Sequence, residues 1–230
     1  MRVDLNADLG EGVTDDPGLL QVVTSANVAC GFHAGDVDTM RAVCELAAER
    51  GVVIGAQVSY LDRDGFGRRQ MEVAGAVLTQ WVAEQVTLLD EVARAAGTGV
   101  SYVKPHGALY NRVVSDPDQA AAVLAGSGSL PVLGLPSSEI LRLARANGRL
   151  TGSEAFPDRG YTAQGTLIPR GQPGALVAEI TDIASNAVAM ATQQQVHSVC
   201  VHGDSAQAVA AARAVRTALE GAGFRLESWC

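Results

Sequence analysis

Six polar residues of this chain could carry chemistry, because each stands at or just beyond the end of a short apolar segment. They are Asp8, His33, Lys104, His106, His202 and Asp204. Short apolar segments are typical of buried strands, and parallel sheets and barrels bind their ligands beyond the carboxyl ends of the strands. We therefore expect these side chains to converge on an active site at one end of a parallel sheet.

Lys104 is the only lysine among the 17 Lys and Arg residues of the chain. This bias reflects either coding composition or a need for an ammonium group at this position. An ammonium group can lose its proton when it is desolvated, whereas a guanidinium group cannot. The motif around Lys104, described below, favours a functional lysine.

Two kinds of chemistry fit these residue types. Asp8, His33 and His106 are suitable ligands for a divalent cation such as zinc or manganese, which would polarise a carbonyl group or activate water. Without a metal, Asp8 or Asp204 can act as a general base, a histidine can carry the proton and Lys104 can stabilise an oxyanion. We favour the metal-free version, since the chain has no local metal-binding spacing such as His-Glu-x-x-His.

Groups that bind anions or act as nucleophiles are less clearly marked. The chain has neither of the glycine-rich loops that hold nucleotide phosphates, so ATP, if it is consumed, would be bound by another chain. Arg68, Arg69 and Arg170 could hold a carboxylate or a phosphate through paired hydrogen bonds, or could simply be solvated. Cys30 could be a nucleophile beside His33, but a small thiol at a strand end is more often packed in the core.

Side-chain alternation places further polar groups in the interior. In the first strand Asp4, Asn6 and Asp8 share one face, while the apolar residues between them share the other. Gln57 is at a corresponding position in the third strand, and Asn27 flanks the end of the second. An unpaired buried polar group costs about 1–3 kcal/mol. We therefore expect these side chains to be hydrogen bonded or functional.

The elements that must position these residues follow one repeating pattern. About seven short apolar runs alternate with longer segments of helical period, which predicts an α/β fold with a parallel sheet or barrel. The expected strands are Arg2–Ala7, Thr24–Ala29, Val52–Val58, Val100–Lys104, Pro131–Leu135, Leu150–Phe156 and Ser198–His202. The expected helices are one capped by Asp38 and ended by Gly51, one over 77–92 that stops at Gly97, one from Ser137 or Ser138 to Gly148, and two near Ala175–Gln194 and Ala206–Glu220.

One irregular segment, Pro157–Pro173, is rich in proline and glycine. Such a composition is typical of a loop that lines or covers a site, although an ordinary surface connection would look the same.

The whole chain is expected to form a single domain over residues 1–230, because no linker interrupts it. Its net charge of -8 and sequence pI near 4.9 disfavour binding to nucleic acid. No stretch is apolar enough to be a signal peptide or to span a membrane, so we expect a cytoplasmic protein. The four cysteines are far apart and are expected to be reduced thiols. The oligomeric state, including a homo-oligomer, is left open.

Five long motifs together resemble one family. They are Asp4–Glu11, Ser25–Asp36, Gly65–Arg69, Val103–Asn111 and Val201–Asp204. In these motifs the chain is similar to the LamB/YcsF family, which supplies the A subunit of bacterial ATP-dependent 5-oxoprolinase. The resemblance covers residues 1 to about 224.

The resemblance implies a (βα) barrel related to polysaccharide deacetylases. It implies a hydrolase that acts with B and C subunits to open the lactam ring of 5-oxoproline to glutamate, using ATP bound with or by those partners. Asp8 would be a base or metal ligand, and Lys104 an oxyanion or phosphate partner. His33 and His106 would carry protons or bind metal, while His202 and Asp204 would form an orienting pair. The implied substrate-binding residues are Asn6, Glu11, Asn27, Asp36, Gln57, Arg68, Tyr110 and Arg170.

Two departures from the family pattern affect this expectation. The family often shows His-Pro-Ser-Tyr where this chain has Gln57-Val58-Ser59-Tyr60, so one imidazole is lost and a three-histidine metal centre is disfavoured. The segment from Gln193 to His197 is shorter than in the family, which could alter partner binding.

Three hypotheses therefore stand. The first is the 5-oxoprolinase A subunit. The second is an autonomous metal-dependent deacetylase or amidohydrolase, which would hold stoichiometric metal and act alone. The third is a non-catalytic scaffold that only positions partner subunits, in which Lys104→Ala would leave the assembled activity nearly unchanged.

Overall fold

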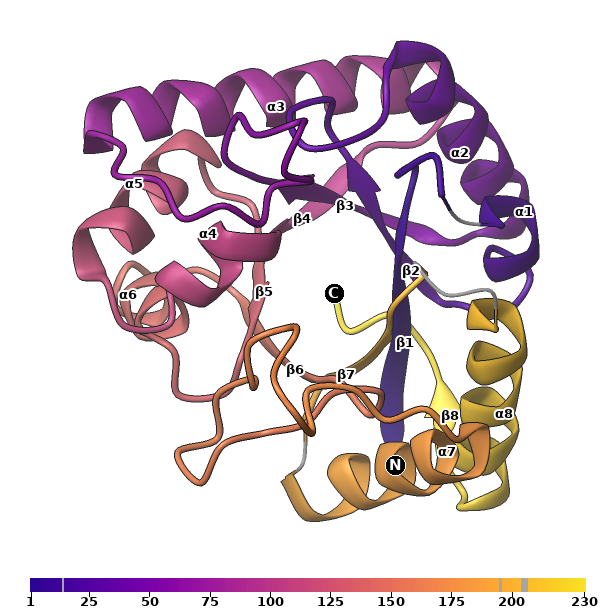
Figure 1. Cartoon of the computed structure of the whole chain (residues 1–230). Helices are drawn as coiled ribbons and strands as arrows, with labels where there is room; N and C mark the ends of the chain where they lie inside the picture. The colour runs from indigo at the N-terminus through magenta and orange to yellow at the C-terminus, as the bar shows by residue number, and fades with distance from the viewer. Residues whose placement is uncertain (14, 195, 204–206) are drawn as a thin grey trace.

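Seven parallel strands form a closed ring in the computed structural model, which describes residues 1–13, 15–194, 196–203 and 207–230 (Figure 1). The strands of the ring are β1 (Arg2–Leu9), β2 (Ser25–Ala29), β3 (Val53–Val58), β4 (Val100–Pro105), β5 (Val132–Gly134), β6 (Thr151–Ala155) and β7 (Ser198–Val201). Each strand pairs with the next, and β1 pairs with both β2 and β7, which closes the barrel. All seven predicted strands are confirmed to within two residues at either end.

Helices on the outside of the ring connect these strands, as Figure 1 shows. They are α1 (Asp16–Leu19), α2 (Val37–Arg50), α3 (Gly75–Ala95), α4 (Gly107–Arg112), α5 (Pro117–Gly126), α6 (Glu139–Ala146), α7 (Ile180–Ala189) and α8 (Ala208–Gly221). A π-helical turn, η1 (Met190–Gln194), extends α7. Their apolar sides pack on the outer face of the barrel in one continuous buried cluster.

The caps of α2 correct one prediction. The side chain of Asp36, not Asp38, accepts a hydrogen bond from the Thr39 backbone amide at 2.8 Å, so the helix begins earlier than expected. Gly51 ends the helix in the left-handed conformation, with φ of 65°, as predicted. The predicted helix from Ala175 instead begins at Ile180, because residues 175–179 belong to the irregular segment before it.

The inner face of the barrel is polar, as the alternation in β1 predicts. Asp4 and Asn6 are fully buried. The Asp4 carboxylate accepts hydrogen bonds from the hydroxyls of Thr24 (2.6 Å), Ser25 (2.7 Å) and Ser198. Burial nevertheless raises the pKa of Asp4 to about 6. These contacts fill the amino-terminal half of the barrel interior.

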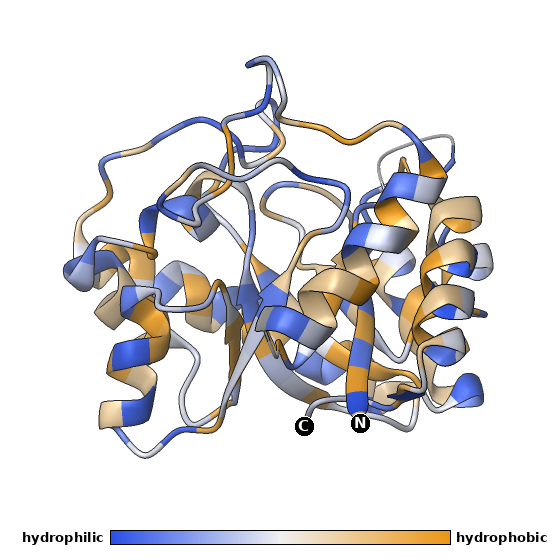
Figure 2. Ribbon diagram, turned by 90° about the horizontal axis from the view of Figure 1, so that it is seen from below, coloured by the Kyte–Doolittle hydropathy of each residue, from blue (hydrophilic) through white to orange (hydrophobic). Residues whose placement is uncertain are grey.

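The C-terminal segment closes that amino-terminal end. A short strand, β8 (Arg225–Leu226), pairs with β1 outside the ring, and the chain then turns toward the barrel axis (Figure 1). The Trp229 ring lies 5.3 Å from the Tyr102 ring and against Gly152, where a Cβ atom would be 2.7 Å from the indole. Figure 2 shows both termini at this end, whereas irregular loops gather at the opposite end. The open end is therefore the carboxyl end of the strands.

No helix in the described ranges is long and apolar enough to cross a membrane. The expectation of a single domain stays a prediction.

Candidate active site

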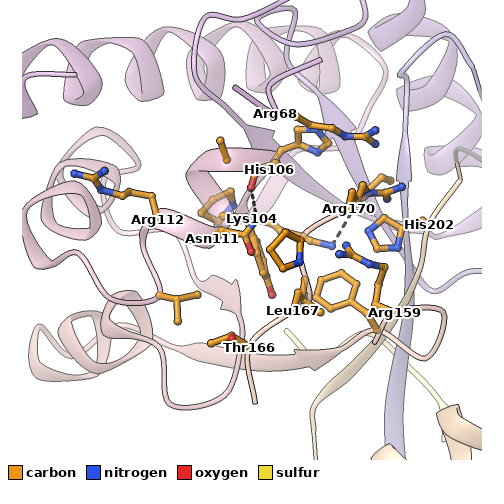
Figure 3. Close-up of a pocket in the computed structure, with 18 of the residues that line it drawn as sticks. Arg68, Lys104, His106, Asn111, Arg112, Arg159, Thr166, Leu167, Arg170 and His202 are labelled. Carbon is orange, nitrogen blue, oxygen red and sulfur yellow. Dashed lines mark hydrogen bonds and ion pairs between the residues drawn. The ribbon is translucent and has the colours of Figure 1, made fainter. Parts of the chain in front are cut away.

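A pocket of about 750 Å³ opens at the carboxyl end of the strands (Figure 3). Eight of the residues predicted from the sequence line it: Asp8, Glu11, Arg68, Lys104, His106, Tyr110, Arg170 and His202. Four others, Asn6, Asn27, His33 and Gln57, are buried around its floor, while Asp36 is exposed at its helix cap. Asp204 lies outside the described residues. The structure thus brings most of the predicted side chains to one end of the barrel.

Lys104 is the charged centre of the pocket floor. Its ammonium group lies 2.9 Å from Glu154 Oε2, 3.3 Å from Asp8 Oδ1 and 3.2 Å from the Cys200 sulfur. Burial lowers the pKa of Lys104, but the surrounding acidic groups outweigh burial and hold it well above its usual value. The expectation that Lys104 could give up its proton on desolvation is therefore wrong, because two carboxylates keep it charged.

Asp8 is held in its ionised form at the pocket floor. Burial raises its pKa, but the Lys104 ammonium, the nearby imidazoles and the Asn27 amide together outweigh burial and hold the pKa below its usual range. The Asn27 amide donates to Asp8 Oδ1 at 3.0 Å and to Asn6 Oδ1 at 2.7 Å, and the Tyr102 hydroxyl donates to Asn27 at 2.6 Å. Asn6 and Asn27 therefore orient Asp8 and Lys104 from below the pocket.

Glu154 was not among the predicted site residues, although strand alternation could have found it. It is the one charged residue of β6 and is fully buried. Burial raises its pKa, and the nearby Lys104 reduces that rise. Tyr110 lies beside it, and burial together with the Glu154 carboxylate holds the Tyr110 pKa well above its usual value. Lys104 thus stands between two carboxylates, one at the pocket and one beneath it.

His202 forms a close pair with Asp158 at another side of the pocket. Asp158 Oδ2 lies 2.8 Å from His202 Nδ1 and also accepts the His202 backbone amide at 3.2 Å. The Phe156 ring stacks on the imidazole at 5.2 Å. Burial lowers the pKa of His202, but the Asp158 carboxylate outweighs burial and raises it above its usual value. Asp158 was not predicted as the partner of His202, and the predicted Asp204 pairing stays untested.

His33 and His106 stack beneath the loop that carries the Gly65–Arg69 motif. Their rings lie 4.0 Å apart at 14°, and the Phe66 ring meets each of them edge-on at 5.8 Å. Gly67 has φ of 68°, and a Cβ atom there would lie 2.9 Å from His33 Cβ and 3.0 Å from His106 Cδ2. Only glycine fits this position without a shift, which explains the glycine of the motif.

The predicted metal ligands are regrouped by the structure. Asp8 is engaged by Lys104 and Asn27, whereas Glu11 lies with His33 and His106 in the one group within the described ranges whose donor atoms could surround a metal ion. The group of possible metal ligands is therefore Glu11, His33 and His106, and not the predicted Asp8, His33 and His106. Burial and the neighbouring His33 hold the pKa of His106 well below its usual value, so His106 is neutral.

The segment over Pro157–Pro173 lines the pocket, as one of the two interpretations of its composition predicts. Leu167, Ile168 and Arg170 face the cavity (Figure 3 labels the first and last). The Arg159 guanidinium anchors the segment by donating to the Ala175 carbonyl at 3.0 Å and the Ile168 carbonyl at 2.7 Å.

Cys30 takes no part in the pocket. It is buried, its thiol donates to the Val28 carbonyl at 3.2 Å, and burial raises its pKa well above its usual value. The packing role that the sequence favoured for Cys30 fits these contacts.

Comparisons with known proteins show the family to which the chain belongs. The LamB/YcsF family model matches residues 3–230. The chain is 55% identical to the A subunit of 5-oxoprolinase from Streptomyces avermitilis and 47% identical to that of Mycobacterium leprae strain TN, with 99% of each chain covered in both cases. A solved structure of the lactam utilization protein from Thermus thermophilus superposes with a TM-score of 0.91 at 34% identity, covering 99% of this chain and 100% of that one. A family 4 carbohydrate esterase from Streptomyces lividans, at 12% identity and a TM-score of 0.56 with 98% and 91% covered, shares the fold alone. The chain therefore belongs to the LamB/YcsF family.

Proposed function

We propose that the chain is the A subunit of an ATP-dependent 5-oxoprolinase and hydrolyses the lactam of 5-oxo-L-proline to L-glutamate together with B and C subunits. The observation that carries this proposal is the set of one cation, one ionised carboxylate and one carboxylate-paired imidazole around the pocket. The names of relatives at 47–55% identity over nearly the full chain agree with it.

The pocket groups supply the three functions that lactam hydrolysis needs. Lys104 carries a fixed positive charge that stabilises the oxyanion formed when water adds to the ring carbonyl. Asp8, which stays ionised, orients that water and accepts its proton. His202, whose pKa is raised by Asp158, donates a proton to the ring nitrogen as the carbon–nitrogen bond breaks. The products are a carboxylate and an amine, as in glutamate.

Substrate charge supports the same site. The protein carries a net charge of -8, yet its pocket is lined by five Lys and Arg residues against Asp8 and Glu11. A cationic pocket in an acidic protein selects an anion. Arg68 and Arg170 both line this pocket (Figure 3), and either can bind the 5-oxoproline carboxylate.

In this proposal the partner subunits, and not this chain, bind ATP. The sequence contains neither glycine-rich phosphate-binding loop, so we assign the nucleotide to the B and C subunits. In this proposal the partner subunits hydrolyse ATP and thereby supply free energy for opening the lactam, whose amide resonance is reflected in a rotational barrier of about 18–20 kcal/mol.

Reconstitution tests the proposal. The three purified subunits with ATP and 5-oxo-L-proline are expected to release glutamate, and omission of this chain is expected to abolish release. Absence of glutamate from three folded, assembled subunits would contradict the proposal. Hydrolysis of an acetylated sugar by this chain alone would instead support the deacetylase hypothesis.

A further inference from the structure

The side-chain amide of Gln57 lies among the three groups that could surround a metal ion. Gln57 Nε2 is 3.0 Å from Glu11 Oε1 and 2.9 Å from His106 Nδ1, and Gln57 Oε1 is 3.2 Å from His33 Nε2. All four side chains are more than nine-tenths buried. One amide therefore satisfies three groups at once.

The two imidazoles are supported in the way that metal-binding histidines usually are. The second nitrogen of His106, Nε2, donates to the Phe66 carbonyl at 3.1 Å, which leaves the Nδ1 lone pair facing Gln57. The second nitrogen of His33, Nδ1, lies 2.9 Å from the Ser59 hydroxyl. Metal ligands are commonly held by such outer hydrogen bonds, which set the tautomer and the ring orientation. The surroundings of this cluster thus suit a cation.

The spacing of the cluster suits the amide better than a cation. Glu11 Oε1 lies 3.7 Å from His33 Nε2 and 3.7 Å from His106 Nδ1. Two ligands of one tetrahedral zinc ion lie about 3.4 Å apart, since each is about 2.1 Å from the metal. Both imidazoles instead direct a ring nitrogen at the same amide group, His33 Nε2 at Gln57 Oε1 and His106 Nδ1 at Gln57 Nε2. The cluster as it stands is therefore too wide for a tetrahedral zinc ion and instead fits the Gln57 amide at its centre.

We propose that the Gln57 amide takes the place of a divalent cation, so that this site is metal-free, and that residue 57 decides whether the cluster binds a metal. The Gln57 NH2 group donates hydrogen bonds to Glu11 and His106, which would give electron pairs to a cation at that place. The Gln57 carbonyl oxygen faces His33. Replacing the amide by a ligand removes the donor that occupies the centre. This inference concerns binding alone and does not depend on the reaction that the pocket catalyses.

Titration with Co²⁺ tests the proposal, because bound Co²⁺ absorbs in the visible range and reports its geometry. The full, untagged wild-type chain is expected to show no stoichiometric binding below about 100 µM. Gln57→His and Gln57→Glu, which place an imidazole or an isosteric carboxylate in the cluster, are expected to bind one Co²⁺ about 100-fold more tightly or better. The matched control is Gln119→Glu, which adds a carboxylate at another buried glutamine that bonds Tyr60 and the Val73 carbonyl instead of imidazoles.

Two results would overturn the proposal. One is tight binding of one Co²⁺ per wild-type chain that is lost in Glu11→Gln, which would show that the amide yields to a cation. The other is unchanged affinity in either Gln57 variant with native circular dichroism, which would show that residue 57 does not control binding. Both results are independent of glutamate release, so they leave the proposed function to its own test.

Discussion

At the scale of single residues, the site depends on one ammonium group that balances two carboxylates. Lys104, Asp8 and Glu154 are each at least nine-tenths buried, and Lys104 contacts both acids within 3.3 Å. Removing one member of a buried ion pair leaves an uncompensated charge, which costs about 3–5 kcal/mol. Lys104 therefore contributes to stability as well as to the proposed chemistry.

We expect Lys104→Met to lower the free energy of unfolding by about 3–5 kcal/mol at pH 7. The loss of stability should be smaller at pH 5. The folded-state pKa of Glu154 is already raised, and it rises further without Lys104. The cost of the unpaired Glu154 charge is therefore present only above the unfolded-state pKa of Glu154. Urea denaturation at both pH values measures this. Arg94→Met, which removes an exposed pair with Asp90, should cost less than about 1 kcal/mol. An equal loss at both pH values would contradict the explanation.

The Asp158–His202 pair makes a prediction about pH dependence. Asp158 raises the His202 pKa, so in the wild type the proton donor stays protonated to a higher pH than a free imidazole. Asp158→Asn should move the basic limb of the kcat/KM profile for glutamate release to lower pH, because the carboxylate that raises the His202 pKa is lost. The loss of activity should therefore be larger at pH 8 than at pH 6, and Asp158→Glu should restore part of it. A uniform loss across the profile would assign Asp158 a purely structural role.

At the scale of elements, strand ends and the loops after them position every group of the site. The loop with the Gly65–Arg69 motif covers the stacked imidazoles and is braced by Asp62, whose carboxylate accepts the backbone amides of Gly65 and Arg69, each at 3.0 Å. The close approach of Gly67 to both histidines links loop and site. This contact is open to a direct test.

We expect Gly67→Ala to destabilise the fold more than the same change at another left-handed glycine. Gly67 combines φ of 68° with close contacts to His33 and His106, whereas Gly148 has φ of 71° and an added Cβ atom there would meet nothing within 4 Å. Gly148→Ala should cost about 1 kcal/mol and Gly67→Ala about 2–3 kcal/mol. Chemical denaturation measures both, and equal losses would mean that the loop does not pack tightly on the imidazoles.

Much of the fold could be predicted because buried parallel strands are short apolar runs with regular helical segments between them. The strand β8 was not predicted, since it is two residues long and pairs only with β1. The helices α1, α4 and α5 were also missed, because two of them have only four and six residues and α5 has a weak pattern rich in alanine. Local periodicity carries little information for such elements.

The site could be predicted as far as side chains stand on strands or at their ends. Glu154 follows the same alternation and was overlooked, whereas Asp158 lies in the irregular segment after β6, where no period applies. Which carboxylate pairs with which base depends on contacts between strands far apart in sequence. In the structure Glu11, and not the predicted Asp8, lies beside the two histidines, and Gln57 bridges Glu11 and the histidines.

At the scale of the whole molecule, the two ends of the barrel have separate tasks. The carboxyl end holds the pocket, and the amino-terminal end is closed by the C-terminal segment with its half-buried Trp229. A barrel of this kind separates stability at one end from chemistry at the other.

Trp229→Ala should therefore lower stability without changing catalysis. Loss of the ring against Tyr102 and Gly152 should reduce the free energy of unfolding by about 2 kcal/mol, less than for a fully buried tryptophan. The rate of glutamate release per folded chain, measured below the melting temperature, should stay within twofold of the wild type. A large fall in that rate would show that the two ends are coupled.

The central claim, that the carboxyl end of this barrel is the active site, is tested most directly by one rate. His202→Gln removes the proposed proton donor from the pocket wall while keeping a polar side chain. In the reconstituted three-subunit enzyme, the rate of glutamate release is expected to fall by about 100-fold to 10,000-fold with assembly intact. The surface variant Arg94→Gln should change the rate little. A His202→Gln rate within twofold of the wild type would contradict the account and favour a scaffold role for this chain.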